Sequence, residues 1–243
     1  MPPPDLTRPA ISVRLMDGFR LLVDGQSVPV IPSSQRIMAY LALRDRPVAR
    51  GVLAEVLWPD IPSSRAAARL RSALWRLVRP PFPSVRSEQG MLSLDTTIGV
   101  DVVAVRRFAA ELTTPDTTTA AACPPASLCA ELLPGWTESW VAAERDWLRQ
   151  LCLRSLEILS ERFRTGGDHF HAHETAAAAV RCDPLRESAH RQLIELHLAD
   201  HNPAAAVRQY TDYRTRLRTE LGLHPSPEIQ RLLAPLLSGL AHD

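Results

Sequence analysis

Residues 63–79 read SSRAAARLRSALWRLVR, and this stretch decides how the N-terminal half of the chain is interpreted. At 100° per residue, alanine and leucine side chains gather within about 60° of Leu70 on one side of a helix expected over about 64–79. Polar side chains fall on the opposite side, between about 180° and 260°. They are Arg65, Arg69, Ser72, Arg76 and Arg79, with Arg71 on the flank. The stretch therefore predicts a helix that buries one face and presents guanidinium groups on the other.

Local carboxylates do not neutralise these arginines, because no acidic residue occurs from position 61 to position 87. A helix that only needs a solvated face usually mixes Glu with Arg, since i,i+4 pairs of opposite charge stabilise it and like charges oppose it. Arg65 and Arg69 form such a like-charged pair. DNA phosphates are suitable counterions, and arginine also pairs with guanine O6 and N7 in the major groove. We interpret the helix as a DNA-recognition element, with a solvated basic face as the alternative.

The flanking segments predict a winged helix. Residues 11–30 alternate apolar and polar side chains around Asp24-Gly25, a tight-turn dipeptide, which predicts three short antiparallel strands. Two helices follow, one capped by Ser33 or Ser34 and one at about 50–58, and the third helix is capped by Ser63 or Ser64. Residues 85–95, VRSEQGMLSLD, predict two strands around a glycine, and a helix through 102–112 closes the domain.

Two further groups of residues are candidates for DNA contact in such a domain. Arg86, Ser87 and Gln89 lie near the tip of the predicted C-terminal hairpin, where they would touch phosphate or the minor groove. Ser34 opens the first helix, where backbone N–H groups bind phosphate. Simple helix capping is an equally good explanation of Ser34.

The C-terminal half has a different character. Residues 113–130 are rich in Thr, Pro and Ala and lack periodicity, so we interpret them as a linker between a domain of residues 1–112 and a domain of residues 131–243. The first 112 residues contain 15 arginines and 10 acidic residues, and the remainder contains 13 arginines and 17 acidic residues. This asymmetry favours contact of the first domain with a polyanion.

Every segment from Leu132 onward has helical periodicity, at about 137–165, 168–181, 187–200, 203–221 and 226–238. Two helix pairs share a period of 34 residues, the length of the tetratricopeptide repeat. Stacked helix pairs of this kind bind peptides or partner helices more often than they carry reactive chemistry. The predicted fold class is an α+β winged helix-turn-helix followed by an all-α, tetratricopeptide-like domain.

The composition argues against an enzyme. All 28 basic residues are arginines, which excludes chemistry that depends on a lysine, such as a P-loop or a Schiff base to pyridoxal phosphate. No Walker, G-x-S-x-G or H-E-x-x-H motif occurs. The histidines at 169, 171 and 173 lack further assignable ligands, so we expect no metal and no cofactor.

The four cysteines show no metal-binding spacing. We expect Cys152 and Cys182 to be small core residues on helices. Cys123 and Cys129 flank a Pro-Pro pair and would be able to form a disulfide under oxidation, but free thiols are the expectation for a cytosolic protein. The absence of a secretion signal and of a long apolar segment predicts a cytoplasmic location without membrane contact.

Taken together, these segments resemble the SARP family of actinobacterial antibiotic regulatory proteins, which join an OmpR-like winged helix to a bacterial transcriptional activator domain. The resemblance covers roughly residues 11–232. Its most specific parts are LLPGWTESWVAAERDWLRQL at 132–151 and CDPLRESAH at 182–190. Other matching stretches are VDGQSVPV at 23–30, VLAEVLWPD at 52–60, LRSALWRLVR at 70–79, GMLSLD at 90–95 and ELGLHPSPE at 220–228.

The resemblance implies a sequence-specific transcriptional activator of secondary-metabolite genes. Proteins of this family bind double-stranded DNA at promoter direct repeats near the −35 element, as side-by-side protomers, and recruit RNA polymerase holoenzyme. By position, the loop that OmpR-like activators offer to polymerase corresponds here to Pro59, Asp60, Ile61, Pro62 and Ser63. The alternative function is a tetratricopeptide-like scaffold for protein interactions, with a winged helix that does not bind DNA.

Overall fold

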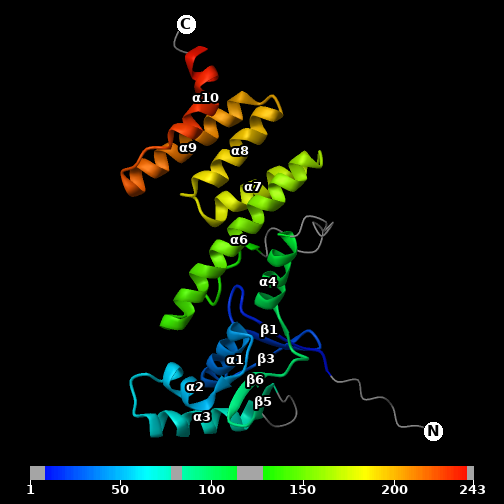
Figure 1. The fold of residues 1–243 in the computed structure, drawn as a ribbon, viewed down its shortest axis with the longest axis vertical. Helices are drawn as coiled ribbons and strands as arrows, with labels where there is room; N and C mark the ends of the chain where they lie inside the picture. The colour runs from blue at the N-terminus through cyan, green and yellow to red at the C-terminus, as the bar shows by residue number, and fades with distance from the viewer. Residues whose placement is uncertain (1–8, 78–83, 114–127, 240–243) are drawn as a thin grey trace, which may run out of the picture. The chain divides into compact units, whose positions relative to one another are not determined.

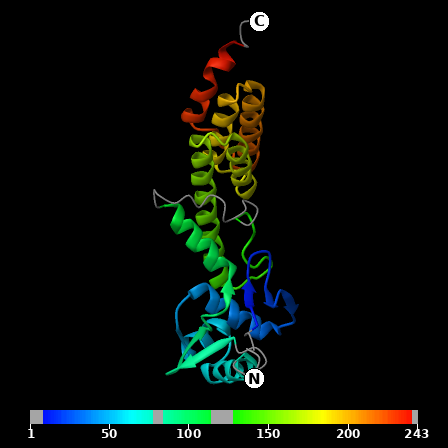
Figure 2. The ribbon, with the colours of Figure 1, turned by 90° about the vertical axis from the view of Figure 1, so that its right-hand side faces the viewer.

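The computed structural model describes residues 9–77, 84–113 and 128–239, which form two compact units (Figure 1, Figure 2). One unit contains residues 1–107 and 131–148, and the other contains residues 108–130 and 149–243. This division differs from the predicted boundaries at 112 and 131, because residues 131–148 pack with the N-terminal unit. Most of the predicted linker, residues 114–127, lies outside the described residues.

The N-terminal unit begins with a four-stranded sheet in the order β3-β2-β1-β7. Strands β1 (Ile11–Arg14), β2 (Arg20–Val23) and β3 (Gln26–Val28) are antiparallel, which confirms the three predicted strands. Asp24 and Gly25 have φ angles of 50° and 80° at the turn between β2 and β3, a left-handed conformation that glycine adopts readily. Strand β7 (Gly99–Val100) pairs parallel to β1 and is too short to produce a periodicity signal.

The three predicted helices and the predicted C-terminal hairpin complete the winged helix, and a short strand that was not predicted joins the hairpin in a second sheet. The helices are α1 (Pro32–Arg44), α2 (Arg50–Leu57) and α3 (Ser63–Leu77). The sheet has the order β4-β6-β5, with β4 at Val48–Ala49, β5 at Val85–Glu88 and β6 at Met91–Leu94. The predicted stripe of α1 is buried, namely Ile37, Tyr40, Leu41 and Leu43, and it shares this core with Leu53 and Leu57 of α2. In Figures 1 and 2, α2, α3 and the β5–β6 hairpin lie at the same end of this unit.

The predicted serine caps are wrong for both α1 and α3. Helix α1 begins at Pro32, which is favoured in a first helical turn, and Ile31 occupies the N-cap without a side-chain hydrogen bond. Helix α3 begins at Ser63, and the carbonyl of Pro62 accepts the N–H groups of Arg65 and Ala66 at 2.9 and 3.0 Å. Prolines thus set both helix starts, so the serines lie within the first turns.

Residues 131–148 join the N-terminal unit through the backbone. The N–H group of Leu133 donates to the carbonyl of Leu15 at 2.9 Å. The guanidinium group of Arg145 donates to three carbonyl oxygens at 2.7–3.1 Å, those of Leu132, Leu133 and Trp136. Trp140 is buried with its ring edge-on to Tyr40, at 5.2 Å between ring centroids. The Arg145 hydrogen bonds hold the segment itself together, whereas the contacts of Leu133 with Leu15 and of Trp140 with Tyr40 connect it to distant residues, so no local pattern reveals them.

Helices α4 (Asp101–Leu112) and α6 (Ser139–Thr165) each continue from one unit into the other along the chain. The C-terminal unit then contains α7 (His169–Cys182), α8 (Glu187–Ala199), α9 (Pro203–Leu221) and α10 (Pro227–Gly239), which confirms the helical prediction. Asp168 caps α7 and Asn202 caps α9 by accepting backbone N–H groups at 3.1 Å. Among the described residues, no helix is long and apolar enough to cross a membrane.

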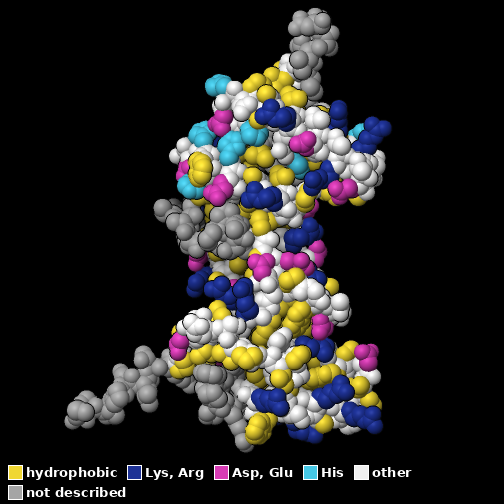
Figure 3. All heavy atoms as spheres, turned by 180° about the vertical axis from the view of Figure 1, so that it is seen from behind, with side chains coloured by type: hydrophobic (Ala, Val, Ile, Leu, Met, Phe, Trp, Pro, Cys, Tyr) yellow, Lys and Arg dark blue, Asp and Glu magenta, His cyan; other side chains and the backbone are white. Residues whose placement is uncertain are grey.

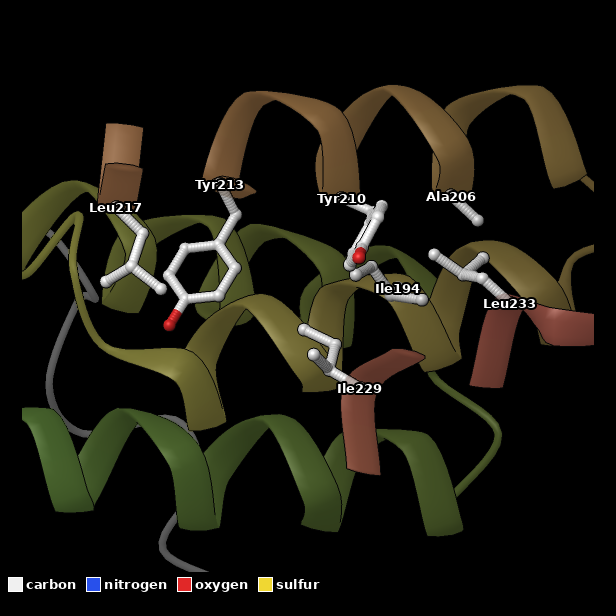
Figure 4. Close-up of a cluster of buried hydrophobic side chains, with 7 residues drawn as sticks. All are labelled: Ile194, Ala206, Tyr210, Tyr213, Leu217, Ile229 and Leu233. Carbon is white, nitrogen blue, oxygen red and sulfur yellow. The ribbon is translucent and has the colours of Figure 1, made fainter. Parts of the chain in front are cut away.

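An apolar cluster holds the last three helices together. Figure 4 shows its side chains converging from α8, α9 and α10. Ile194, Ala206, Ile229 and Leu233 are completely excluded from solvent. Tyr210, Tyr213 and Leu217 of α9 complete the cluster.

His190 of α8 is buried in the C-terminal unit as a neutral ring. Its ring stacks on Tyr213 at 4.3 Å between centroids, Nε2 lies 3.0 Å from the carbonyl of Pro184, and Nδ1 lies 2.7 Å from Nε2 of Gln209. The Gln209 amide donates to Nδ1 and Nε2–H donates to the carbonyl, so the neutral tautomer satisfies both partners. Burial lowers the pKa of His190, because the charged ring loses its hydration.

This histidine makes the stability of the protein depend on pH. Between the lowered pKa of His190 in the folded state and the ordinary value near 6.5, the unfolded chain binds a proton that the folded chain does not. We therefore expect the free energy of unfolding to reach its full value above about pH 6.5. As the pH decreases from about 6.5, the free energy of unfolding should decrease by at most about 1.4 kcal/mol per pH unit for one histidine. His197 has a pKa that is also lowered by burial and adds to the effect. Urea unfolding at pH 7, 6 and 5 measures the slope.

The matched variants are His190→Gln and His224→Gln, because His224 is exposed. The slope should decrease in the first variant and stay unchanged in the second. An unchanged slope in His190→Gln would show that the buried ring does not titrate in this range.

The predictions for two cysteines are wrong. Cys129 and Cys182 form a disulfide, with their Cα atoms 5.3 Å apart, although we expected a free thiol at 129 and a core residue at 182. The two positions are 53 residues apart, and only the fold brings the last residue of α7 beside position 129. Cys152 is buried, as predicted, and Cys123 lies outside the described residues.

Candidate nucleic-acid interface

Helix α3 is amphipathic in the way that its sequence predicts. The alanines and leucines of one face are buried, namely Ala66, Leu70, Ala73, Leu74 and Leu77. These side chains anchor the helix in the core of the N-terminal unit, mainly against α2. The opposite face is therefore fixed in orientation and presented to solvent.

We call this exposed surface the arginine face, defined by Arg65, Arg69, Arg71, Ser72 and Arg76. All five residues are exposed. Within residues 9–77, 84–113 and 128–239, the four arginines have no hydrogen-bond or ion-pair partner. Figure 3 shows separate arginine side chains at the end of the N-terminal unit that carries α3. Arg79, the remaining predicted contact of this helix, lies outside the described residues.

The β5–β6 hairpin forms the predicted wing. Gln89 and Gly90 make its turn with φ angles of 48° and 81°, which fits the twist of a tight two-residue hairpin. Gln89 and Ser87 are both exposed. They are accessible to a ligand at the end of the unit where α3 lies (Figure 1).

Arg50 is a cationic residue of this region that the sequence reasoning missed. It begins α2, and its Nη2 donates to Oγ of Ser87 at 2.7 Å, while its backbone N–H donates to the carbonyl of Gly90 at 3.1 Å. The pairing of β4 with β6 brings it to the hairpin. No local pattern predicts this pairing, because β4 has only two residues.

Arg86 has an acidic partner that reduces its availability. Its Nε donates to Oδ2 of Asp95 at 2.9 Å, across the β5–β6 pair. The hydrogen bond from Arg86 lowers the pKa of Asp95 well below its usual range, with further hydrogen bonds from Thr97. A phosphate at Arg86 would have to compete with this carboxylate, so we rank Arg86 below the arginine face.

Ser34 is removed from the candidate interface. Its side chain is only 2% exposed, and its backbone N–H donates to the carbonyl of Ile31 at 2.9 Å. The predicted phosphate contact needs both an open helix start and a free N–H group. Since α1 begins at Pro32, Ser34 lies inside the first turn and faces the core.

The loop between α2 and α3 is accessible. Trp58 closes α2 by donating its N–H to the carbonyl of Ala54 at 3.0 Å, and Pro62 directly precedes α3. Of the five predicted loop residues, Ile61 is half-buried and the others are exposed, namely Pro59, Asp60, Pro62 and Ser63. The structure thus leaves this loop available to a partner.

Trp75 is a second residue that the sequence reasoning did not assign to the interface. It lies on α3 beside Arg76, and 58% of it is exposed. Its angular position, about 140° from Leu70, is a signal that would have found it. The exposed side of α3 therefore carries an aromatic ring as well as guanidinium groups.

The histidines of α7 pair with a carboxylate. Asp200 Oδ1 lies 2.9 Å from Nδ1 of His169, and Asp200 Oδ2 lies 2.6 Å from Nε2 of His173. The hydrogen bond from His173 lowers the pKa of Asp200. No group of three or more His, Cys, Asp or Glu residues in the described part of the chain is arranged to hold a metal ion.

Comparison with known proteins agrees with this architecture. The model of the bacterial transcriptional activator domain matches residues 106–237. Among curated proteins, the chain is similar to the regulatory protein AfsR of Streptomyces coelicolor, at 27% identity over 248 residues, and of Streptomyces griseus, at 26% over 243 residues. These matches cover 94% and 93% of this chain but 24% of each relative, so the chain spans about a quarter of their length.

A solved structure has a similar fold. Mycobacterium tuberculosis EmbR, in complex with a low affinity phosphopeptide, superposes with a TM-score of 0.70 at 21% identity, covering 95% of this chain and 66% of the EmbR chain. This similarity confirms the predicted fold of a winged helix followed by a helical domain. The domain model covers more than half of the sequence. The chain therefore belongs to the SARP family of transcriptional regulators, the family marked by the bacterial transcriptional activator domain.

Proposed function

We propose that this protein is a sequence-specific DNA-binding transcriptional activator. The observation that carries the proposal is the arginine face of α3, whose four guanidinium groups have no acidic partner among the described residues. Four exposed cations on one rigid helix repel one another in the free protein, and a polyanion relieves this repulsion. The arginine fork is suited to bidentate contacts with phosphate and with guanine.

The hairpin supports the same proposal. In winged helices of this kind, the third helix enters the major groove and the hairpin touches the adjacent backbone. Ser87, Gln89 and Arg50 are the candidates for such contacts, since they are exposed near the β5–β6 turn. Arg79 remains a candidate from the sequence.

The family resemblance suggests the type of DNA site, the association of protomers and the role of the helical domain. We propose that the binding site is a promoter direct repeat near the −35 element, that protomers associate side by side on it, and that the helical domain mediates protein contacts in the cytoplasm. The similarity to two regulatory proteins supports control of transcription. Control of a secondary-metabolite gene cluster is the corresponding proposal for the biological target.

The direct test is selection from random double-stranded DNA with the full chain. We expect enrichment of a motif that occurs twice in the same orientation, with the two copies about one helical turn apart. Retention of all sequences equally would contradict sequence-specific binding. Retention of none at low salt would contradict DNA binding as a whole.

Recruitment of RNA polymerase through the α2–α3 loop is a separate prediction. Asp60→Ala should leave DNA affinity unchanged and lower activated transcription in vitro about 5- to 30-fold, as expected for the loss of an interface contact of about 1–2 kcal/mol. The matched control is Glu55→Ala, which removes an exposed carboxylate from α2. Equal activation by the Asp60→Ala protein and the wild type would exclude this residue from the polymerase contact.

A further inference from the structure

A cavity of about 350 Å³ lies in the N-terminal unit, lined by residues of α1, the α1–β4 connection, β6, β7 and α4. Cavities of about 300–1,000 Å³ are typical of small-molecule sites. The lining is mainly apolar, with Leu41 from α1, Leu94 from β6 and Val103 from α4. The cavity is therefore suited to the apolar part of a small ligand.

One carboxylate of the lining, that of Asp95, already has partners within the protein. Its Oδ1 accepts hydrogen bonds from the backbone N–H and the hydroxyl group of Thr97 at 2.9 and 2.7 Å. Its Oδ2 accepts a hydrogen bond from Nε of Arg86 at 2.9 Å. Because both oxygens are paired, Asp95 is not available to a ligand.

Asp45 and Arg46 are the charged residues of the lining whose side chains remain free. Both are exposed, and neither side chain has a hydrogen bond or an ion pair with a residue that the structure describes. The backbone of Asp45 is fixed at the end of α1, where its N–H donates to the carbonyl of Leu41 at 3.3 Å and its φ angle is 48°. Two opposite charges thus lie beside one apolar cavity without neutralising each other.

We propose that this cavity binds an amino acid with an apolar side chain. The ammonium group of the ligand pairs with Asp45, its carboxylate pairs with the guanidinium fork of Arg46, and its side chain covers the apolar lining. A ligand with a single charge satisfies only one of the two residues and brings that charge near a like charge. The inference is independent of the proposed DNA binding, because neither residue belongs to the arginine face.

Isothermal titration calorimetry of the full chain, without DNA, tests the proposal. The probes are L-leucine and L-phenylalanine, for which ligands of this size are expected to have a Kd of about 1 mM or tighter. Each is compared with the acid that lacks the ammonium group, 4-methylpentanoate or 3-phenylpropanoate, and with the amine that lacks the carboxylate, 3-methylbutylamine or 2-phenylethylamine. We expect each single-charge analogue to bind about three- to fivefold more weakly, the effect of losing one exposed ion pair.

Two variants assign the two charges. Asp45→Asn keeps a residue that tolerates the left-handed backbone, and it should remove the preference for the amino acid over the acid. Arg46→Gln should remove the preference for the amino acid over the amine. The matched controls are Asp17→Asn and Arg20→Gln, since both residues are exposed and Asp17 also has a left-handed φ angle, of 58°. Both controls should keep the preferences of the wild type, and urea unfolding checks that each variant is folded.

The titrations decide the proposal in either direction. Binding of an amino acid, with each preference lost in its own variant and kept in the controls, supports it. If neither L-leucine nor L-phenylalanine binds, the cavity is not an amino-acid site and the proposal is overturned. Equal binding of an amino acid and its single-charge analogues, or unchanged preferences in Asp45→Asn and Arg46→Gln, overturns the roles of these two residues.

Discussion

Replacement of Arg65, Arg69 and Arg76 together by alanine should lower the affinity for the selected duplex at least about 100-fold. Each arginine that contacts DNA contributes about 1–3 kcal/mol, and three losses of about 1 kcal/mol already exceed a factor of 100. The three side chains are exposed, and the described residues offer them no acidic partner. Their removal therefore costs little folding stability, and the loss reports on binding.

The matched control replaces three other exposed arginines of the same unit, Arg14, Arg20 and Arg46. It removes the same net charge from β1, from β2 and from the connection between α1 and β4, so it measures the effect of charge alone. We expect it to lower affinity much less than the first triple replacement. Equal losses of DNA affinity in the two proteins would mean that any exposed arginine attracts DNA equally and that α3 has no special role.

The salt dependence of the DNA affinity distinguishes arginines that contact phosphate from arginines that contact a base. Each phosphate contact that is removed should decrease the slope of log affinity against log salt by about one. Replacement of an arginine that contacts a base edge should instead change the preference for that base pair. Single replacements of Arg65, Arg69 and Arg76, titrated at several salt concentrations, assign each side chain to one of the two classes.

The second large effect concerns the disulfide of the C-terminal unit. Breaking the bond between Cys129 and Cys182 should lower the free energy of unfolding by about 4 kcal/mol, because the bond closes a loop of 53 residues and restricts the unfolded chain. The double replacement Cys129→Ser/Cys182→Ser, compared with the oxidised wild type, measures this difference in urea.

Cys123→Ser is the control for this experiment, because it keeps both members of the observed pair. It should unfold like the wild type. Addition of a reducing agent should destabilise the wild type and leave the double variant unchanged. If reduction has no effect on the wild type, the bond does not contribute to the stability of this unit.

The local features of the fold could be predicted from the sequence. Alternation of side chains and the Asp24-Gly25 turn predicted β1, β2 and β3, and the helical period predicted α3 and its buried leucines. These signals are local, since the residues that form each element are neighbours in the sequence. The arginine face follows from the same periodicity, so its exposure could be predicted as well.

Contacts between distant residues could not be predicted in this way. The ion pair of Arg86 with Asp95 and the hydrogen bond of Arg50 with Ser87 depend on strand pairing. The disulfide depends on the packing of α7 against position 129. For Ser34, local capping chemistry gave the wrong result, because Pro32 started the helix two residues earlier and buried the serine.

Chemical modification of arginine tests the central claim most directly. The full chain is treated with phenylglyoxal, with and without the selected duplex, and the modified arginines are identified by mass spectrometry. Bound DNA should protect Arg65, Arg69 and Arg76 and leave Arg20 reactive, since all four are exposed in the free protein. If the three arginines of α3 react equally fast in the complex, this helix does not form the DNA-binding surface.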